Sequence, residues 1–98
     1  LITDAGTPCV SDPGYILIKN LIKNNIEYTV VPGACSIITS LLLSGFDTSM
    51  FMFIGFLPNT QHKRCELLTQ ICQIHKTIII YTTVNKLNKD LLNIYEFF

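Results

Sequence analysis

The predicted fold rests on the stretch Leu1-Ile2-Thr3-Asp4-Ala5-Gly6-Thr7-Pro8-Cys9-Val10-Ser11-Asp12-Pro13-Gly14. Its first three residues are typical of the end of a strand, and residues 4–11 are rich in turn formers. Asp12 and Pro13 suit the start of a helix, with Asp as the N-cap and Pro at the first helical position, where its missing N–H costs nothing. The stretch therefore predicts a strand, a loop and a helix in succession.

Outward from this stretch, strand and helix patterns alternate along the chain. Leu17, Ile18, Leu21 and Ile22 form an apolar stripe that extends the first helix to Asn24-Asn25. Strands are predicted at 27–31, 51–56 and 77–81, the last one of the kind that is buried on both faces. Helices are predicted from Ala34 to Ser44 with Gly45 as its left-handed end, from Thr60 with Leu67, Leu68, Ile71 and Cys72 on one face, and over the last segment with Leu87, Leu91, Ile94, Tyr95 and Phe98 at helical spacing. This order predicts an α/β fold with mainly parallel sheets.

Turn residues at 46–50 separate two βαβα units. We predict two α/β units, residues 1–47 and residues 48–98. The chain starts within a predicted strand and ends on apolar residues without a helix stop. We therefore expect it to be part of a longer protein.

The composition is that of a globular protein, since 49% of the 98 residues are hydrophobic and 14% are charged. The formal net charge is zero, which gives no overall electrostatic attraction to nucleic acid. No apolar run approaches the ~18 residues that a membrane span needs. The four cysteines form no CxxC pair and have no histidine at zinc-finger spacing, so we expect no metal site and thiols that pack as small hydrophobic groups in a reducing cytoplasm.

The loop at residues 4–11 follows a predicted strand, and ligands of open α/β sheets sit beyond the carboxyl ends of strands. Gly6 would let the backbone approach a ligand closely, and Pro8 would stiffen the turn. The loop has no Walker lysine and no Gly-x-Gly-x-x-Gly, so it suits a compact ligand with an amine, a carboxylate and a ribose better than a polyphosphate. A purely structural role as turn formers and helix caps explains the same residues.

Four ordered motifs resemble the bacterial 16S rRNA cytidine 2′-O-methyltransferase family, within the tetrapyrrole methylase superfamily. They are residues 3–14, Val31-Pro32-Gly33-Ala34-Cys35-Ser36, Ser44-Gly45-Phe46 and Phe51-Met52-Phe53-Ile54-Gly55-Phe56-Leu57-Pro58. The last is similar to the family's Phe-x-Phe-x-Gly-Phe-Leu-Pro segment. Tetrapyrrole methylases carry Gly-Asp-Pro in the first loop, so Gly6-Thr7-Pro8 favours the RNA branch.

The resemblance implies that S-adenosylmethionine binds in a cleft between two α/β domains. Residues 1–47 would then be the second half of a Rossmann-like N-terminal domain that binds S-adenosylmethionine, and residues 48–98 would begin a second α/β domain. The cofactor-binding residues would be Ala5, Gly6, Thr7, Ser11, Asp12, Cys35 and Ser36. The implied reaction is methyl transfer to a ribose 2′-hydroxyl, in which alignment of the attacking oxygen dominates the rate. Asp4 is the candidate general base, although a structural role for Asp4 explains its position equally well.

The resemblance also implies RNA contacts by the basic residues Lys63, Arg64 and Lys86. A solvated helix start explains Lys63 and Arg64 equally well, and we expect His62 to be a surface residue. The family pattern Tyr-Glu-Ser-Pro-His-Arg-Leu reads differently here, because Thr82 replaces the acid, Asn85 replaces the histidine and Lys86 replaces the arginine. Lysine lacks the planar fork of arginine, so these departures put the activity in doubt.

Three functions remain open at this point. The leading one is methylation of a cytidine ribose in small-subunit rRNA, by a cytoplasmic enzyme that is a homodimer in its full-length form. The second is methylation of a tetrapyrrole of the precorrin type. The third is a degenerate, noncatalytic remnant that only binds a ligand or RNA.

Overall fold

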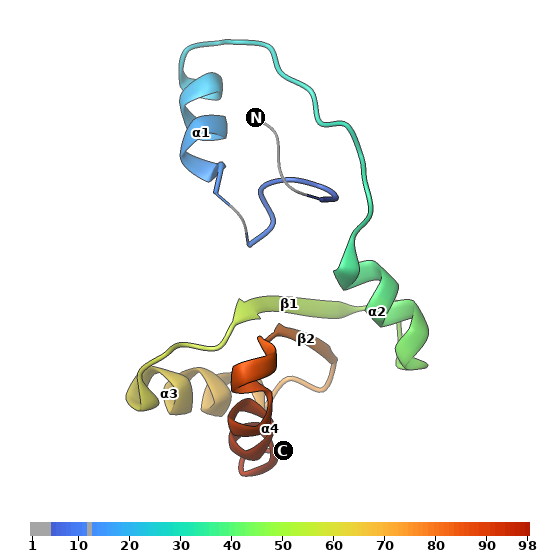
Figure 1. Cartoon of the computed structure of the whole chain (residues 1–98), viewed down its shortest axis with the longest axis vertical. Coiled ribbons are helices and arrows are strands. Elements are labelled where there is room, and N and C mark those ends of the chain that lie inside the picture. Colours follow the sequence, from blue (N-terminus) through green and yellow to red (C-terminus); the bar gives the residue numbers. More distant parts are fainter. Residues whose placement is uncertain (1–4, 12) are drawn as a thin grey trace. The chain divides into compact units, whose positions relative to one another are not determined.

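A computed structural model of the chain describes residues 5–11 and 13–98 (Figure 1). The chain divides into two compact units, Leu1–Ser40 and Leu41–Phe98. In chain order the elements are α1 (Tyr15–Lys23), α2 (Ser36–Ser44), β1 (Phe51–Phe56), α3 (Gln61–Ile71), β2 (Thr77–Tyr81), the 3₁₀ turn η1 (Val84–Lys86) and α4 (Leu87–Tyr95). The division between the units falls within the sequence of α2, and the domain boundary between residues 47 and 48 stays a prediction.

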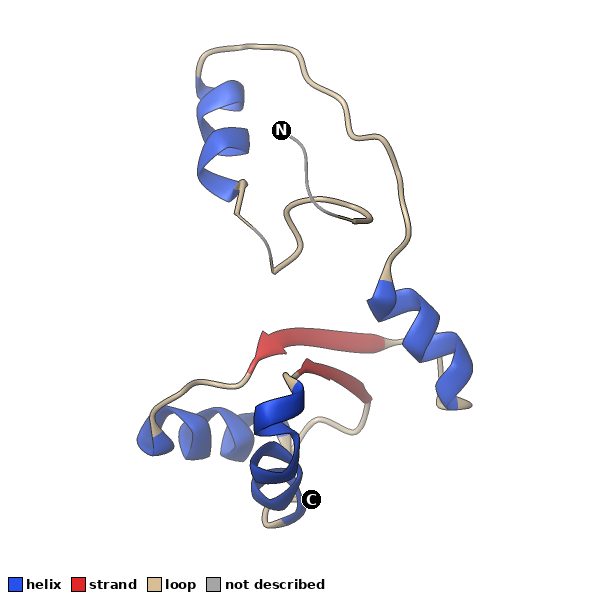
Figure 2. Cartoon of the chain, in the orientation of Figure 1, coloured by secondary structure: helices blue, strands red, loops and turns tan. Residues whose placement is uncertain are grey.

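The second unit is an α/β unit built on a two-stranded parallel sheet, as Figure 2 shows in red. Both strands have the bounds predicted from the sequence. Parallel strands need a crossover connection, and α3 supplies it. The α/β class with parallel pairing is therefore confirmed, although β2 is half-buried along its whole length rather than buried on both faces.

The parallel ladder contains one irregularity near the end of β1. Phe53 pairs with Ile79 and Phe56 pairs with Tyr81, so β1 contains one more residue than β2 between these two pairs. Gly55 lies there with φ of 71°, a left-handed conformation that favours glycine. The extra residue lets both Phe53 and Phe56 reach the Tyr81 ring, with ring centroids 4.7 and 5.4 Å away.

The core of the second unit lies on one face of this sheet. Its buried residues are Leu57, Leu68 and Ile71, and half-buried isoleucines from β1, β2 and α4 pack against them: Ile54, Ile78, Ile80 and Ile94. The alternation of Ile78 and Ile80 along β2 puts both side chains on one face. Figure 1 shows α3 and α4 together on that side of the strands.

Helix α4 confirms the helix predicted for the last segment, but only part of its apolar residues face the core. Of the residues predicted at helical spacing, Leu87, Leu91, Ile94, Tyr95 and Phe98, Tyr95 is 85% exposed and Leu91 is 55% exposed. Asp90 is buried instead, and Ile94 and Phe97 pack on the core. Asp90 sets the rotation of α4 about its own axis, since its carboxylate pairs with the buried guanidinium of Arg64.

The start of α1 was also predicted too early, because the helix begins at Tyr15 with Gly14 as its N-cap. Asp12, the predicted cap, lies outside the described residues. The predicted end at Asn24-Asn25 is confirmed by a Schellman arrangement, in which the Asn25 N–H donates to the Ile22 carbonyl and the Ile26 N–H to the Leu21 carbonyl. None of the residues of α1 is fully buried, so the predicted stripe is at most half-buried.

The predicted second helix begins two positions later than expected, at Ser36, and Gly45 follows its end with φ of 72°, as predicted. The predicted strand at 27–31 is wrong for the structure described here, since these residues form no strand. A strand needs a neighbour for its backbone groups, and no strand exists among the described residues of the first unit. The predicted strand at 1–3 lies outside the described residues.

The described helices leave no candidate for a membrane span, because none in residues 5–11 and 13–98 is both long and apolar enough to cross a bilayer.

Truncating Leu68 should destabilise the protein strongly, because its side chain is completely buried in the core of the second unit. We expect Leu68→Ala to lower the free energy of unfolding by about 2–5 kcal/mol. Leu92→Ala is the matched control, because Leu92 is 66% exposed and such a change costs about 0.5 kcal/mol or less. Urea unfolding followed by circular dichroism measures both, and equal losses would contradict the assigned core.

Candidate functional site

The first unit brings two predicted cofactor-binding segments into contact. The Thr7 N–H donates to the Ala34 carbonyl oxygen at 3.1 Å, which joins the first loop to residues 32–34, where no turn is formed. Cys35 and Ser36 follow this segment directly, and Ser36 is the first residue of α2. The predicted residues Ala5, Gly6 and Thr7 thus lie beside the segment that leads into the predicted residues Cys35 and Ser36.

The Thr7 hydroxyl strengthens the same contact from both sides. It donates to the Gly33 carbonyl oxygen at 3.1 Å and accepts from the Gly33 N–H at 3.1 Å. One side chain therefore satisfies both backbone groups of Gly33. With the Thr7 backbone bond to Ala34, these contacts hold the loop to the two adjacent residues Gly33 and Ala34.

The contact depends on the absence of side chains at two glycines. A Cβ atom at Gly6 would lie 2.3 Å from the Ala34 carbonyl oxygen, and Gly6 has φ of 74°. A Cβ atom at Gly33 would lie 3.0 Å from the Gly6 carbonyl carbon. Side chains at Gly6 or Gly33 would therefore push the two backbones apart, so both glycines are needed for the close contact.

The loop beyond this contact follows an unusual path. Cys9 and Ser11 have positive φ values of 68° and 55°, which non-glycine residues adopt rarely and usually where the surroundings require it. Ser11 is exposed and takes no part in the Thr7–Gly33 contacts. The predicted residues Asp4 and Asp12 lie outside the described residues.

The second unit gathers polar side chains where both parallel strands end. Pro58 and Asn59 follow β1, while Thr82 and Thr83 follow β2. Because the carboxyl ends of parallel strands meet at one edge of a sheet, these loops lie on the side where α/β proteins bind ligands. Lys86 lies in η1, and its ammonium group donates to the Asn59 side-chain oxygen at 2.8 Å.

Arg64 does not lie on this surface as predicted. Its residue exposure is 2%, and its Nη1 donates to Asp90 Oδ1 at 2.9 Å and to Asn93 Oδ1 at 2.8 Å. Its Nε donates to the Pro58 carbonyl oxygen at 3.1 Å. A buried guanidinium needs such partners to offset its lost hydration. Arg64 is therefore not exposed for the predicted contact with RNA, and its side chain binds groups within the protein instead. Lys63 is exposed, as is His62, which agrees with the surface position expected for His62.

Thr82, which departs from the family pattern, belongs to the same polar cluster. Its hydroxyl donates to Asp90 Oδ2 at 2.5 Å, so the two oxygens of Asp90 bind different partners. A carboxylate therefore lies next to residue 82, although Thr82 itself carries none. Asn85, the other departure, is exposed in η1.

Sequence reasoning missed Asp90, Asn93 and Asn59. A signal for Asp90 existed, since it precedes Ile94 by four residues and shares its helix face. The apolar stripe through Leu91 was the more conspicuous pattern and concealed it. No local signal joins Arg64 to Asp90, which lies 26 positions further along the chain.

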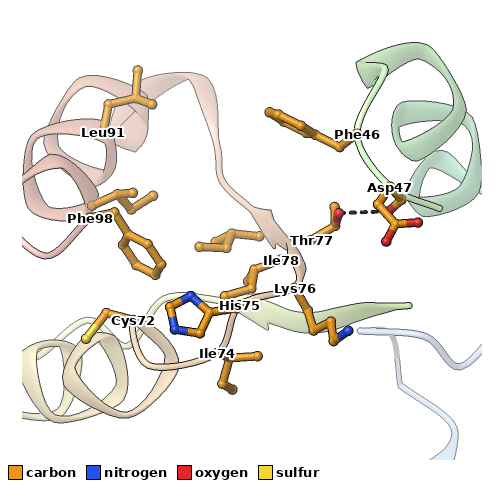
Figure 3. A pocket seen from close by; sticks show the side chains of 12 residues that line it. Phe46, Asp47, Cys72, Ile74, His75, Lys76, Thr77, Ile78, Leu91 and Phe98 are labelled. Atoms are coloured by element: carbon orange, nitrogen blue, oxygen red, sulfur yellow. Dashed lines mark hydrogen bonds between the residues drawn. The ribbon is translucent and has the colours of Figure 1, made fainter. Parts of the chain in front are cut away.

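The second unit also contains a groove of about 990 Å³ that the sequence did not predict. Figure 3 shows Leu91 and Phe98 on one side of it, with the α3–β2 loop residue His75 also lining it. At its rim the Thr77 hydroxyl donates to the Asp47 carbonyl oxygen at 2.8 Å. Hydrogen bonds from the Ser49 hydroxyl and N–H hold the pKa of Asp47 below its ordinary value. The mostly apolar lining suits an apolar group better than a charged ligand.

The cysteines and acidic residues build no metal centre within the described ranges, where no group of three or more His, Cys, Asp or Glu side chains could hold a metal ion. The four cysteines are free thiols, and each is half-buried.

Comparison with known proteins gives one consistent group of relatives. Residues 1–97 match the family model described as tetrapyrrole (corrin/porphyrin) methylases. The chain is 42% identical over 98 residues to a ribosomal RNA small subunit methyltransferase I of Rickettsia prowazekii (strain Madrid E). This match covers all of the chain and 35% of the relative. A protein of the same name from Halalkalibacterium halodurans is 41% identical over 93 residues, 95% of this chain and 32% of the relative. The chain thus spans about a third of the length of the curated relatives it matches.

Replacing Gly6 should separate the first loop from Gly33 and Ala34. We expect Gly6→Ala to remove the Thr7–Ala34 hydrogen bond, because the new Cβ would lie 2.3 Å from the Ala34 carbonyl oxygen. Losing this bond should accelerate amide hydrogen exchange at Thr7 by about tenfold, measured by NMR.

The matched control is Gly45→Ala. Gly45 has nearly the same φ, 72°, but a Cβ there has nothing within 4 Å. It therefore pays only the conformational cost, about 1–2 kcal/mol. Unchanged Thr7 exchange in Gly6→Ala would show that the close contact does not hold the loop.

Proposed function

Because the chain belongs to the tetrapyrrole (corrin/porphyrin) methylase family, we propose that its residues form part of an S-adenosylmethionine-dependent methyltransferase that modifies small-subunit ribosomal RNA. The relatives carry the name ribosomal RNA small subunit methyltransferase I, which supports this substrate. More narrowly, we propose that the target is the 2′-hydroxyl of a cytidine in 16S rRNA, as the Gly6-Thr7-Pro8 loop favours over a tetrapyrrole.

The observation that carries the cofactor proposal is the contact of Gly6 and Thr7 with Gly33 and Ala34. The small residues Gly6, Gly33 and Ala34 fit S-adenosylmethionine, because its flat adenine needs a wall without bulky side chains. Ala5, Gly6 and Thr7 would form one wall, and Cys35 and Ser36 the other. Ser11 and Asp12 would support the loop from its far end.

When bound, S-adenosylmethionine supplies a methyl group made electrophilic by its positively charged sulfur. The residues of the chain then have to bind RNA and orient the attacking oxygen, because alignment dominates such a reaction. Exposed Lys63 and Lys86 are suited to RNA phosphates. Asp4 would accept the proton of the ribose hydroxyl, and a structural role for Asp4 is the alternative.

The same proposal implies a cytoplasmic enzyme, since its substrate is ribosomal RNA, and a homodimer in the full-length protein. A noncatalytic remnant is the competing function, and the exposed Asn85 at the position of the family's histidine favours it. Thr82 argues less strongly for a remnant, because the Asp90 carboxylate lies directly beside it.

Methylation is tested by nucleoside mass spectrometry of small-subunit rRNA from cells with and without the intact gene. We expect 2′-O-methylcytidine to disappear from one site when the gene is deleted and to return when it is restored. An unchanged level at every site would contradict the RNA assignment. A gene product that binds S-adenosylmethionine without restoring methylation would support the noncatalytic function.

Binding of the cofactor should depend on the Thr7 hydroxyl. Thr7→Val keeps the shape of the side chain but removes both hydrogen bonds to Gly33. We expect the Kd of the intact protein for S-adenosylmethionine to rise about three- to tenfold in calorimetry, the range for lost hydrogen bonds. Thr7→Ser retains the hydroxyl and is expected to stay within about twofold of the original protein. Equal affinities of all three proteins would remove Thr7 from the cofactor site.

A further inference from the structure

Arg64 and Asp90 form a buried ion pair that connects the loops at the ends of both strands. The side chains are 2% and 6% exposed, and their closest charged atoms are 2.9 Å apart. Arg64 lies on α3, the crossover helix, and Asp90 lies on α4. The pair therefore ties together the two helices that cover one face of the sheet.

Each member of the pair also holds one loop. Arg64 Nε donates to the carbonyl oxygen of Pro58, in the loop after β1. Asp90 Oδ2 accepts from the hydroxyl of Thr82, in the loop after β2. The contacts run without interruption from Pro58 through Arg64 and Asp90 to Thr82. They fix the separation of the two loops at the edge of the sheet.

The exposed side of this edge presents one cation in a defined place. Asn59 follows Pro58, and its side-chain oxygen accepts from the Lys86 ammonium group at 2.8 Å. An exposed lysine has many conformations, so this bond selects one of them. Its acceptor lies beside the residue that Arg64 holds, so the place of Lys86 depends on the buried pair.

We infer that Arg64 and Asp90 are positioning residues for RNA, which hold Pro58–Asn59 and Thr82 so that Lys86 meets a phosphate of the substrate. This inference rests on the proposed rRNA methyltransferase function and adds residues that do not touch the RNA themselves. Buried ion pairs often contribute little net stability. A positional role accounts for a pair whose three other side-chain hydrogen-bond partners, Pro58, Thr82 and Asn93, lie in the two loops and on α4.

The test compares steady-state kinetics of the intact protein on small ribosomal subunits for four variants. Lys86→Gln removes the cation, Asn59→Ala removes its acceptor and Asp90→Asn removes the negative charge of the buried pair. Lys89→Gln is the matched control, because Lys89 is an exposed cation on α4 next to Asp90. Asn59 is exposed, so Asn59→Ala keeps the test decisive if Asp90→Asn does not fold.

We expect Asn59→Ala and Asp90→Asn to raise KM for the subunit about tenfold, since displacement of a positioned group by about 1 Å can cost up to a hundredfold. The Kd for S-adenosylmethionine should not change. The slope of the logarithm of the RNA-binding constant against the logarithm of the salt concentration should become less steep by about one. We expect this change in both variants, as in Lys86→Gln. Lys89→Gln should leave KM within about twofold.

The double variant Lys86→Gln with Asp90→Asn distinguishes positioning from stability. If Asp90 acts through Lys86, the double variant is no worse in KM than the more severe single variant. Effects on KM that add, or a lower thermal stability with KM and salt slope unchanged, would overturn the inference. A starting protein that neither binds nor methylates the subunit overturns the proposed function itself, which is a different result.

Discussion

Parallel pairing of β1 with β2 constrains everything else in the second unit. Two parallel strands cannot be joined by a tight turn, so the chain has to return across one face of the sheet. Helix α3 makes that return and brings Leu68 and Ile71 onto the sheet face, where they form the core. The same geometry sends the ends of both strands to one edge. Arg64 lies near the start of the crossover helix. It is therefore close enough to bind the loop after β1 directly and the loop after β2 through Asp90.

The two polar regions of the chain achieve precise placement by opposite means. In the first unit, Gly6 and Gly33 bring two backbones together because neither has a side chain, and the Thr7 hydroxyl completes the contact. In the second unit, the ion pair of Arg64 and Asp90 places the loops from the interior. The first arrangement fails when an atom is added. The second fails when a charge is removed, because the remaining partner stays buried without compensation.

The strands were predictable because short apolar runs between turn residues leave few alternatives, and both have the expected bounds. Features that depend on distant residues were not. The strand expected at 27–31 needs a neighbour that no local pattern supplies, and the orientation of α4 depends on a charge pair between Arg64 and Asp90. For the candidate site, the resemblance to a known family implied that both segments line the cofactor cleft. It could not indicate that Thr7 would join them through Gly33.

The irregular step in β1 has a consequence for strand alignment. A regular ladder can slide by two residues without turning any side chain to the other face, because side chains alternate with a period of two. Short apolar strands therefore risk several alignments of similar energy. The extra residue near Gly55 removes that degeneracy, since a slid ladder would carry Tyr81 away from the rings of both Phe53 and Phe56. One glycine thus gives an otherwise repetitive strand a single alignment.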